Sequence, residues 1–117
     1  MRDTIAREMK EHADEELGHA QILTQRIIQL GGTPLLKPSE WQQMSNCDYI
    51  TPNNPAVKSL LMQNIKAEQC AIDVYHKLAK TTKDIDAITY HLALKIMNDE
   101  INHEEDLETL LADLNSQ

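Results

Sequence analysis

The sequence predicts an all-α fold, a bundle of three long helices with a long crossover between the first and the second. Apolar residues recur in alternating steps of three and four along three stretches, as on one face of an α-helix. Three glycines and four prolines leave few interruptions, and no strand-like alternation is present. With 117 residues, the chain is expected to form one domain over 1–117.

The first helix is predicted from Arg2 to about Leu30. Gly31 and Gly32 end it, and Pro34 prevents its continuation. Its main stripe mixes apolar and ionisable side chains: Ile5, Met9, His12, Glu16, His19, Leu23 and Leu30. A second stripe beside it is small enough for close approach of another helix: Ala6, Ala13, Ala20 and Ile27.

The crossover runs from Thr33 to Asn54, with a short helical turn expected near Ser39. Asn54 and Pro55 then predict a helix start, with asparagine as the N-cap and proline at the first helical position. The stripe of this second helix contains Leu61, Ile65, Glu68, Ile72, Tyr75 and Ala79.

A short turn at residues 81–83 separates the second and last helices, and Thr82 or Asp84 is expected to cap the last one. The stripe of the last helix contains Ile96, Glu100, His103, Leu107, Leu110 and Leu114. All three predicted helices therefore carry at least one carboxylate where the pattern calls for an apolar residue.

Composition narrows the choice of partners and compartment. The net charge of −8 argues against nucleic acid or an anionic membrane as a partner. No apolar run is long enough to span a bilayer. Cys47 and Cys70 lack metal-type spacing, and without a secretory signal they indicate reduced thiols in the cytoplasm, one in a loop and one in a helix.

Two Glu-x-x-His pairs, Glu16 with His19 and Glu100 with His103, occupy the predicted core stripes. Residues three apart share a helix face, and Glu68 lies on the stripe of another helix. Buried carboxylates repel one another, and a bound cation removes that cost. Carboxylates with imidazoles suit iron, manganese or zinc, whereas the lack of cysteine disfavours a structural zinc site.

The alternative for a single Glu-x-x-His is an ordinary pair of surface residues, which is the commoner case. Two pairs joined by a third core glutamate favour a metal site, because this is the pattern of di-iron carboxylate bundles. His12, one turn before Glu16, is either a spare ligand or, more commonly, a histidine at the core edge.

Three segments carry a family resemblance. DEELGHAQILTQRIIQLGGTP resembles the second helix of the ferritin-like di-iron superfamily, closest to bacterioferritins, and NDEINHEEDLETLL resembles the fourth helix. NIKAEQCAIDVYHKL resembles the third helix, and the long crossover also matches. The resemblance implies a ferritin-like bundle whose first helix, with one further carboxylate ligand, is absent from this sequence.

The resemblance also implies roles for individual residues. His19 and His103 each bind one iron, Glu16 and Glu100 bridge, and Glu68 binds at one end. Glu15 and Asp99 hold the places of outer-shell carboxylates that orient a histidine, or are solvent-facing charges. Leu17 stands where bacterioferritins carry a haem-ligating methionine, so no haem is expected.

The function implied is non-haem di-iron chemistry. Fe(II) would be oxidised by oxygen or peroxide, a ferroxidase reaction serving iron storage or detoxification, in a homo-oligomer. One alternative is a truncated, non-catalytic subunit that self-associates and binds metal partially or not at all. The other is a rubrerythrin-like di-iron oxidase that reduces peroxide. The chain is an enzyme only if the di-iron site is complete.

Overall fold

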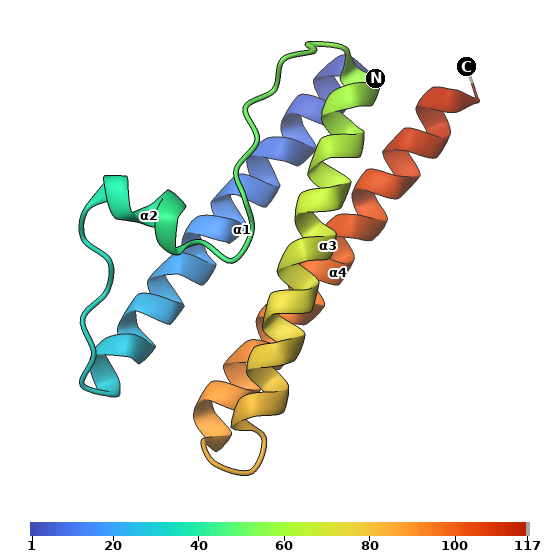
Figure 1. Ribbon diagram of the computed structural model, residues 1–117. Helices are drawn as coiled ribbons and strands as arrows, with labels where there is room; N and C mark the ends of the chain where they lie inside the picture. The colour runs from blue at the N-terminus through green and yellow to red at the C-terminus, as the bar shows by residue number, and fades with distance from the viewer. Residues whose placement is uncertain (117) are drawn as a thin grey trace. The chain divides into compact units, whose positions relative to one another are not determined.

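The structure, a computed structural model, describes residues 1–116, and every regular element in that range is an α-helix. The helices are α1 (Arg2–Gln29), α2 (Pro38–Met44), α3 (Val57–Thr82) and α4 (Ala87–Asn115) (Figure 1). The all-α prediction is confirmed, with three long helices and the short one expected within the crossover. No helix in the described range is long and apolar enough to cross a membrane.

The chain forms two compact units, and each is described by itself. The first unit, residues 1–49, contains α1 and α2, and the second begins at Ile50 and contains α3 and α4. The predicted metal ligands are therefore divided between the two units.

In the first unit, α1 ends where the sequence predicts. The amide of Leu30 donates to the carbonyl of Arg26, and the amide of Gly32 donates to that of Ile27 at 2.9 Å. Gly31 has a φ of +84°, a left-handed conformation that glycine adopts without a steric cost. The predicted stripe of small residues on this helix is exposed: Ala6, Ala13, Ala20 and Ile27.

The crossover is held partly by its own side chains. The indole N–H of Trp41, on α2, donates to the carbonyl oxygen of Leu35 at 2.9 Å. Trp41 is nevertheless exposed, as is Leu36. This local hydrogen bond closes the chain around the start of α2 without an apolar core.

Both cysteines are disulfide-bonded, so the prediction of two reduced thiols is wrong. Cys47 lies in the loop after α2 and Cys70 lies on α3, as expected from the sequence. Disulfide formation depends on how closely two cysteines approach in space. Separation along the chain gives no information about that approach.

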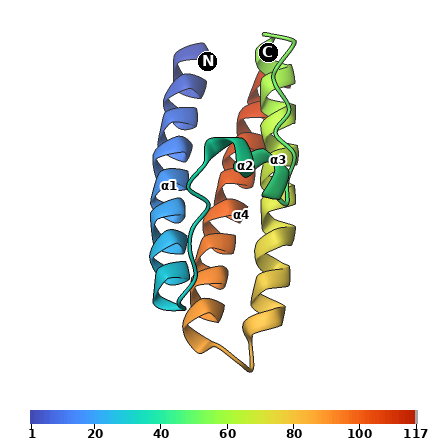
Figure 2. The same ribbon diagram turned by 60° about the vertical axis from the view of Figure 1, so that its left-hand side comes forward.

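In the second unit, α3 and α4 lie side by side as a helical hairpin joined by a short turn (Figures 1 and 2). The buried aliphatic residues of this unit lie on the predicted apolar stripes, apart from Ala93, which is outside the stripe predicted for the last helix. On α3 these are Leu61, Ile65 and Ala79, and on α4 they are Ala93, Ile96 and Leu107. The hairpin holds opposing side chains of the two helices in register.

Both predicted start points in this unit are wrong by a few residues. The cap of α3 is Ala56 rather than Asn54, whose side chain instead accepts a hydrogen bond from the Ala56 amide at 3.0 Å. The cap of α4 is Asp86 rather than Thr82 or Asp84, and its carboxylate accepts from the Thr89 amide at 3.1 Å. Several polar residues near each start are suitable caps, and the chain path selects among them.

Candidate metal centre

Glu100 and His103 lie in the middle of the buried stripe of α4. Ile96 precedes them and Leu107 follows them, both fully buried. Glu100 and His103 are each only 2 % exposed. An ionised carboxylate at such a position costs several kcal/mol unless a positive charge compensates it.

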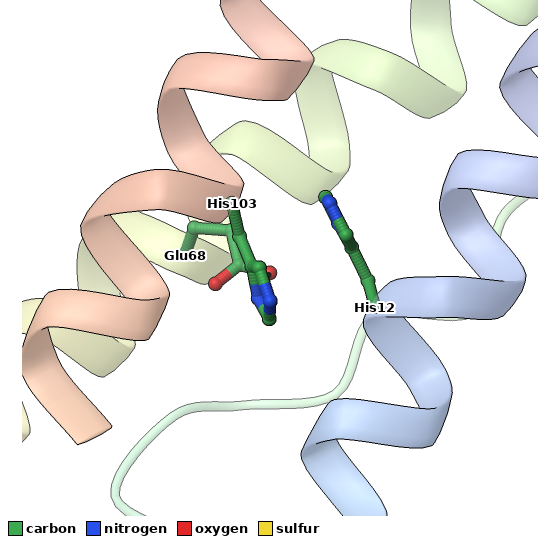
Figure 3. A group of neighbouring side chains, drawn as sticks. All are labelled: His12, Glu68 and His103. Carbon is green, nitrogen blue, oxygen red and sulfur yellow. Dashed lines mark ion pairs between the residues drawn. The ribbon is translucent and has the colours of Figure 1, made fainter. Parts of the chain in front are cut away.

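Glu68 reaches the same place from α3. Its Oε1 lies 3.7 Å from Nδ1 of His103, and Oε1 of Glu100 lies 3.5 Å from the same nitrogen. Figure 3 shows Glu68 and His103 pointing toward one another from adjacent helices. These three residues, here called the α3–α4 triad, each offer one ligand atom within 4.8 Å of the others.

The spacing within the triad suits a shared cation. A direct N–H···O hydrogen bond spans about 2.7–3.2 Å, shorter than either distance. Ligand atoms held at about 2.0–2.2 Å from one ion stand roughly 3.0–3.6 Å apart, close to the 3.5 Å and 3.7 Å within the triad. Two carboxylates and one imidazole also match the donor preferences of iron, manganese and zinc. The triad therefore fits a divalent metal in geometry, charge and donor type.

The remaining predicted ligands lie on α1, in the first unit. Nδ1 of His19 is 3.7 Å from Oε2 of Glu16. This pair repeats the Glu-x-x-His geometry of α4, but the Glu16 side chain is 43 % exposed. Glu16 and His19 as ligands remain a prediction, because each unit supplies only its own half of the proposed set.

A third glutamate–histidine pair lies one turn earlier on α1. Nε2 of His12 is 3.3 Å from Oε1 of Glu8, four residues before it. Glu8 is not among the residues predicted for the site, whereas His12 is considered as a spare ligand. The signal was present, because residues four apart on a helix are neighbours.

Asp99 and Glu15 are the two carboxylates predicted to orient a histidine ligand. Oδ2 of Asp99 lies 3.4 Å from Nζ of Lys95, one turn earlier on α4. Glu15 is exposed on α1. The role of either residue in orienting a histidine remains a prediction.

Known proteins resemble the chain along its whole described length. The family model described as "Ferritin-like domain" matches residues 1–116. The chain belongs to the ferritin-like family. Its fold is accordingly the ferritin-like helical bundle that the sequence predicts.

A solved structure supports the same conclusion. A dodecameric thioferritin, the bacterioferritin-related protein from Bacteroides fragilis, is 40 % identical with a TM-score of 0.97. The match covers 99 % of this chain and 69 % of that one.

A curated relative is more distant. The "DNA protection during starvation protein" of Pyrococcus furiosus is 36 % identical over 98 residues. The match covers 83 % of this chain and 53 % of the relative, so this ferritin-like chain spans about half the length of that relative.

Proposed function

We propose that this ferritin-like protein binds Fe(II) and catalyses its oxidation by dioxygen or peroxide, a ferroxidase reaction that serves iron storage or detoxification. The observation that carries the proposal is the α3–α4 triad, in which half-buried Glu68 meets buried Glu100 and His103. Glu16 and His19 of α1 complete the proposed ligand set. Membership of the ferritin-like family supports the same substrate.

The carboxylates of the triad perform the main electrostatic task. Fe(II) enters as a divalent substrate, and Glu68 with Glu100 supplies two negative charges. Oxidation raises the charge to be balanced, and oxygen ligands favour the harder product ion. Because Glu100 is buried, its interaction with a cation is screened less than that of a surface carboxylate. The triad thus stabilises the oxidised product more than the substrate.

His103 supplies a neutral ligand and limits the total charge. Its Nδ1 faces both carboxylates of the triad. A lone pair on Nδ1 requires the ring proton to be on Nε2, so the site selects one tautomer. Fe(II) binding therefore competes with protonation of His103 and weakens as pH falls.

We also propose that the protein forms a homo-oligomer and does not bind nucleic acid. The Bacteroides fragilis relative is a dodecamer, which supports self-association of this chain. The Pyrococcus furiosus relative is named for DNA protection. With a net charge of −8, however, this chain is expected to be repelled by phosphate backbones, and protection would come from removing Fe(II) rather than from coating DNA.

The deciding experiment is an anaerobic titration of metal-free protein with Fe(II), counting tightly bound iron per chain. We expect about two, as for a dinuclear centre. Replacing Glu105, an exposed neighbour on α4, with Gln provides the matched control and should leave the count unchanged. Absence of tight binding would overturn the proposal and favour a non-catalytic subunit.

The oxidant is tested on the same iron-loaded protein. Rapid mixing with dioxygen or with hydrogen peroxide, followed by the absorbance of Fe(III), gives the two rates. Two Fe(II) ions supply the two electrons that reduce peroxide to water or dioxygen to peroxide. Oxidation only by peroxide would favour the rubrerythrin-like alternative.

A further inference from the structure

Ligand-type side chains continue along α1 beyond the pair proposed for the dinuclear centre. Steps of four, four and three residues separate Glu8, His12, Glu16 and His19. At about 100° per residue, these steps keep all four side chains within about 80° of one another around the helix axis. One face of α1 therefore presents carboxylate and imidazole in alternation over roughly 16 Å, at about 1.5 Å per residue.

Glu8 and His12 have the geometry of two ligands on one ion. Nε2 of His12 lies 3.3 Å from Oε1 of Glu8. This distance is within the roughly 3.0–3.6 Å that separates ligand atoms held at about 2.0–2.2 Å from one metal. The corresponding nitrogen–oxygen distance in the pair of Glu16 and His19 is 3.7 Å. The earlier pair is therefore the closer of the two on α1.

Burial also distinguishes this pair from an ordinary surface pair. The side chain of Glu8 is 27 % exposed and that of His12 is 9 % exposed. The neighbouring acidic residues Glu11 and Glu15 are exposed. A carboxylate that is less exposed is screened less by water, so it attracts a cation more strongly. Glu8 is thus better placed to bind a cation than the other two carboxylates.

We propose that Glu8 and His12 bind a further divalent cation, at a site separate from the proposed dinuclear centre, and that this site supplies Fe(II) to Glu16 and His19. The supply role rests on the proposed function, whereas the metal site itself does not. Because Glu8 and His12 fill only two coordination positions of the ion, water completes the others and the ion is held weakly. A weak site releases its ion to a tighter one, as a supply site must.

The path from this site to the next ligand is short. Glu16 follows His12 by four residues, which is about 6 Å along the helix axis. Each turn of this face offers a carboxylate or an imidazole, so an ion can move from one turn to the next without returning to bulk water. The order of ligands along α1 therefore favours transfer between the two pairs.

The metal site is tested with Co(II), which binds these donors somewhat more tightly than Fe(II) does. Calorimetric titration of the metal-free protein should show a further, weaker Co(II) ion per chain beyond those of the proposed dinuclear centre. Glu8→Gln should weaken this ion by at least about 10-fold, since even outer-shell changes cost about 10–100-fold in metal affinity. Glu11→Gln removes the same charge at an exposed position on α1, so it is the matched control and should not.

Glu8→His separates metal binding from a simple ion pair between Glu8 and His12. Two histidines four residues apart on one helix face form a metal-binding pair. Co(II) affinity should therefore be retained or increased in this variant, whereas the ion pair is lost. The further ion should also persist when Glu8 and His12 are intact and Glu100→Gln disables the triad. Equal Co(II) affinity in Glu8→Gln and Glu11→Gln, or loss of the ion in Glu8→His, would overturn the inference.

The supply role is tested by adding Fe(II) with an oxidant in two successive portions. Oxidation of the second portion should be several-fold slower in Glu8→Gln than in Glu11→Gln, because the ions must then reach Glu16 and His19 directly from solution. Equal rates in the two variants would overturn the supply role alone. No oxidation of either portion by the wild type would instead contradict the proposed function, and the Co(II) titration would still decide the metal site.

Discussion

The two Glu-x-x-His pairs are the same motif in two different environments. The histidine nitrogen and the glutamate oxygen lie 3.7 Å apart on α1 and 3.5 Å apart on α4. Yet the Glu16 side chain is 43 % exposed, whereas Glu100 is 2 % exposed and joined by Glu68 from the neighbouring helix. The motif therefore fixes local geometry, and the neighbouring helix determines how strongly a cation is needed.

The difference follows from connectivity. A short turn places α3 directly against α4, so a stripe glutamate of one helix meets the pair of the other. The α1 helix instead leads into the crossover, and its own unit provides only a further pair on the same helix, Glu8 with His12. We therefore expect α4 to bind the first iron and the α1 pair to depend on it.

The largest expected effect is loss of metal binding on changing α4. Glu100→Gln or His103→Gln should lower Fe(II) affinity by at least about 100-fold, beyond the roughly 10–100-fold that outer-shell changes cost. Each variant replaces a buried carboxylate or imidazole ligand with an amide, which is a weaker ligand for Fe(II). Anaerobic titration measures the affinity, with Glu105→Gln as control. Wild-type affinity in both variants would contradict the assignment of the triad.

A smaller effect is expected on α1. His19→Gln should leave about one tightly bound iron per chain where the wild type binds about two, because the α3–α4 triad remains intact. The count comes from the same titration. Two bound ions in this variant would exclude His19 as a ligand. Loss of both would show that the two pairs act as one unit, and the contrast drawn between α1 and α4 would fail.

Much of this contrast is readable from the sequence. The steps of three and four placed Glu68, Glu100 and His103 on core stripes, and the hairpin brings these three together. Periodicity predicts which face of a helix is buried, because burial depends on side chains that recur with the helix turn. Gly31 likewise marked the end of α1, since its φ of +84° suits glycine.

Other features depend on where the chain goes in space. Asp86 rather than Asp84 caps α4, and its carboxylate accepts a hydrogen bond from the Thr89 amide. The disulfide state of Cys47 and Cys70 depends on a spatial approach that no spacing rule contains. The sequence also does not predict that Glu16 is more exposed than Glu100, because the two residues occupy equivalent positions in their stripes.

Stability of the metal-free protein tests the burial of Glu100 directly. Glu100→Gln should raise the free energy of unfolding by about 2 kcal/mol, because it removes a buried negative charge that lies beside the carboxylate of Glu68. Urea unfolding of the metal-free protein measures it, and Glu16→Gln, at a partly exposed position, should change it by less than about 0.5 kcal/mol. With saturating metal, the wild type should become more stable than Glu100→Gln, because the wild type gains the free energy of metal binding. Equal stability of both metal-free variants would mean that Glu100 is not strained by burial.

The smallest effect concerns the helix starts. The N-cap of α4 is Asp86, whose carboxylate makes the cap hydrogen bond, whereas the N-cap of α1, Met1, makes no side-chain cap. Asp86→Ala should therefore cost about 1 kcal/mol of stability, the usual value of an N-cap hydrogen bond. Asp84→Ala, two residues earlier and exposed, serves as the control. Urea unfolding of the metal-free protein gives both values.

If Asp84→Ala were the more damaging, the cap would lie where the sequence first indicated. Because Thr89 is buried at the opposite end of α4 from Leu107, losing the cap should loosen the hairpin end and leave Fe(II) affinity at the triad nearly unchanged.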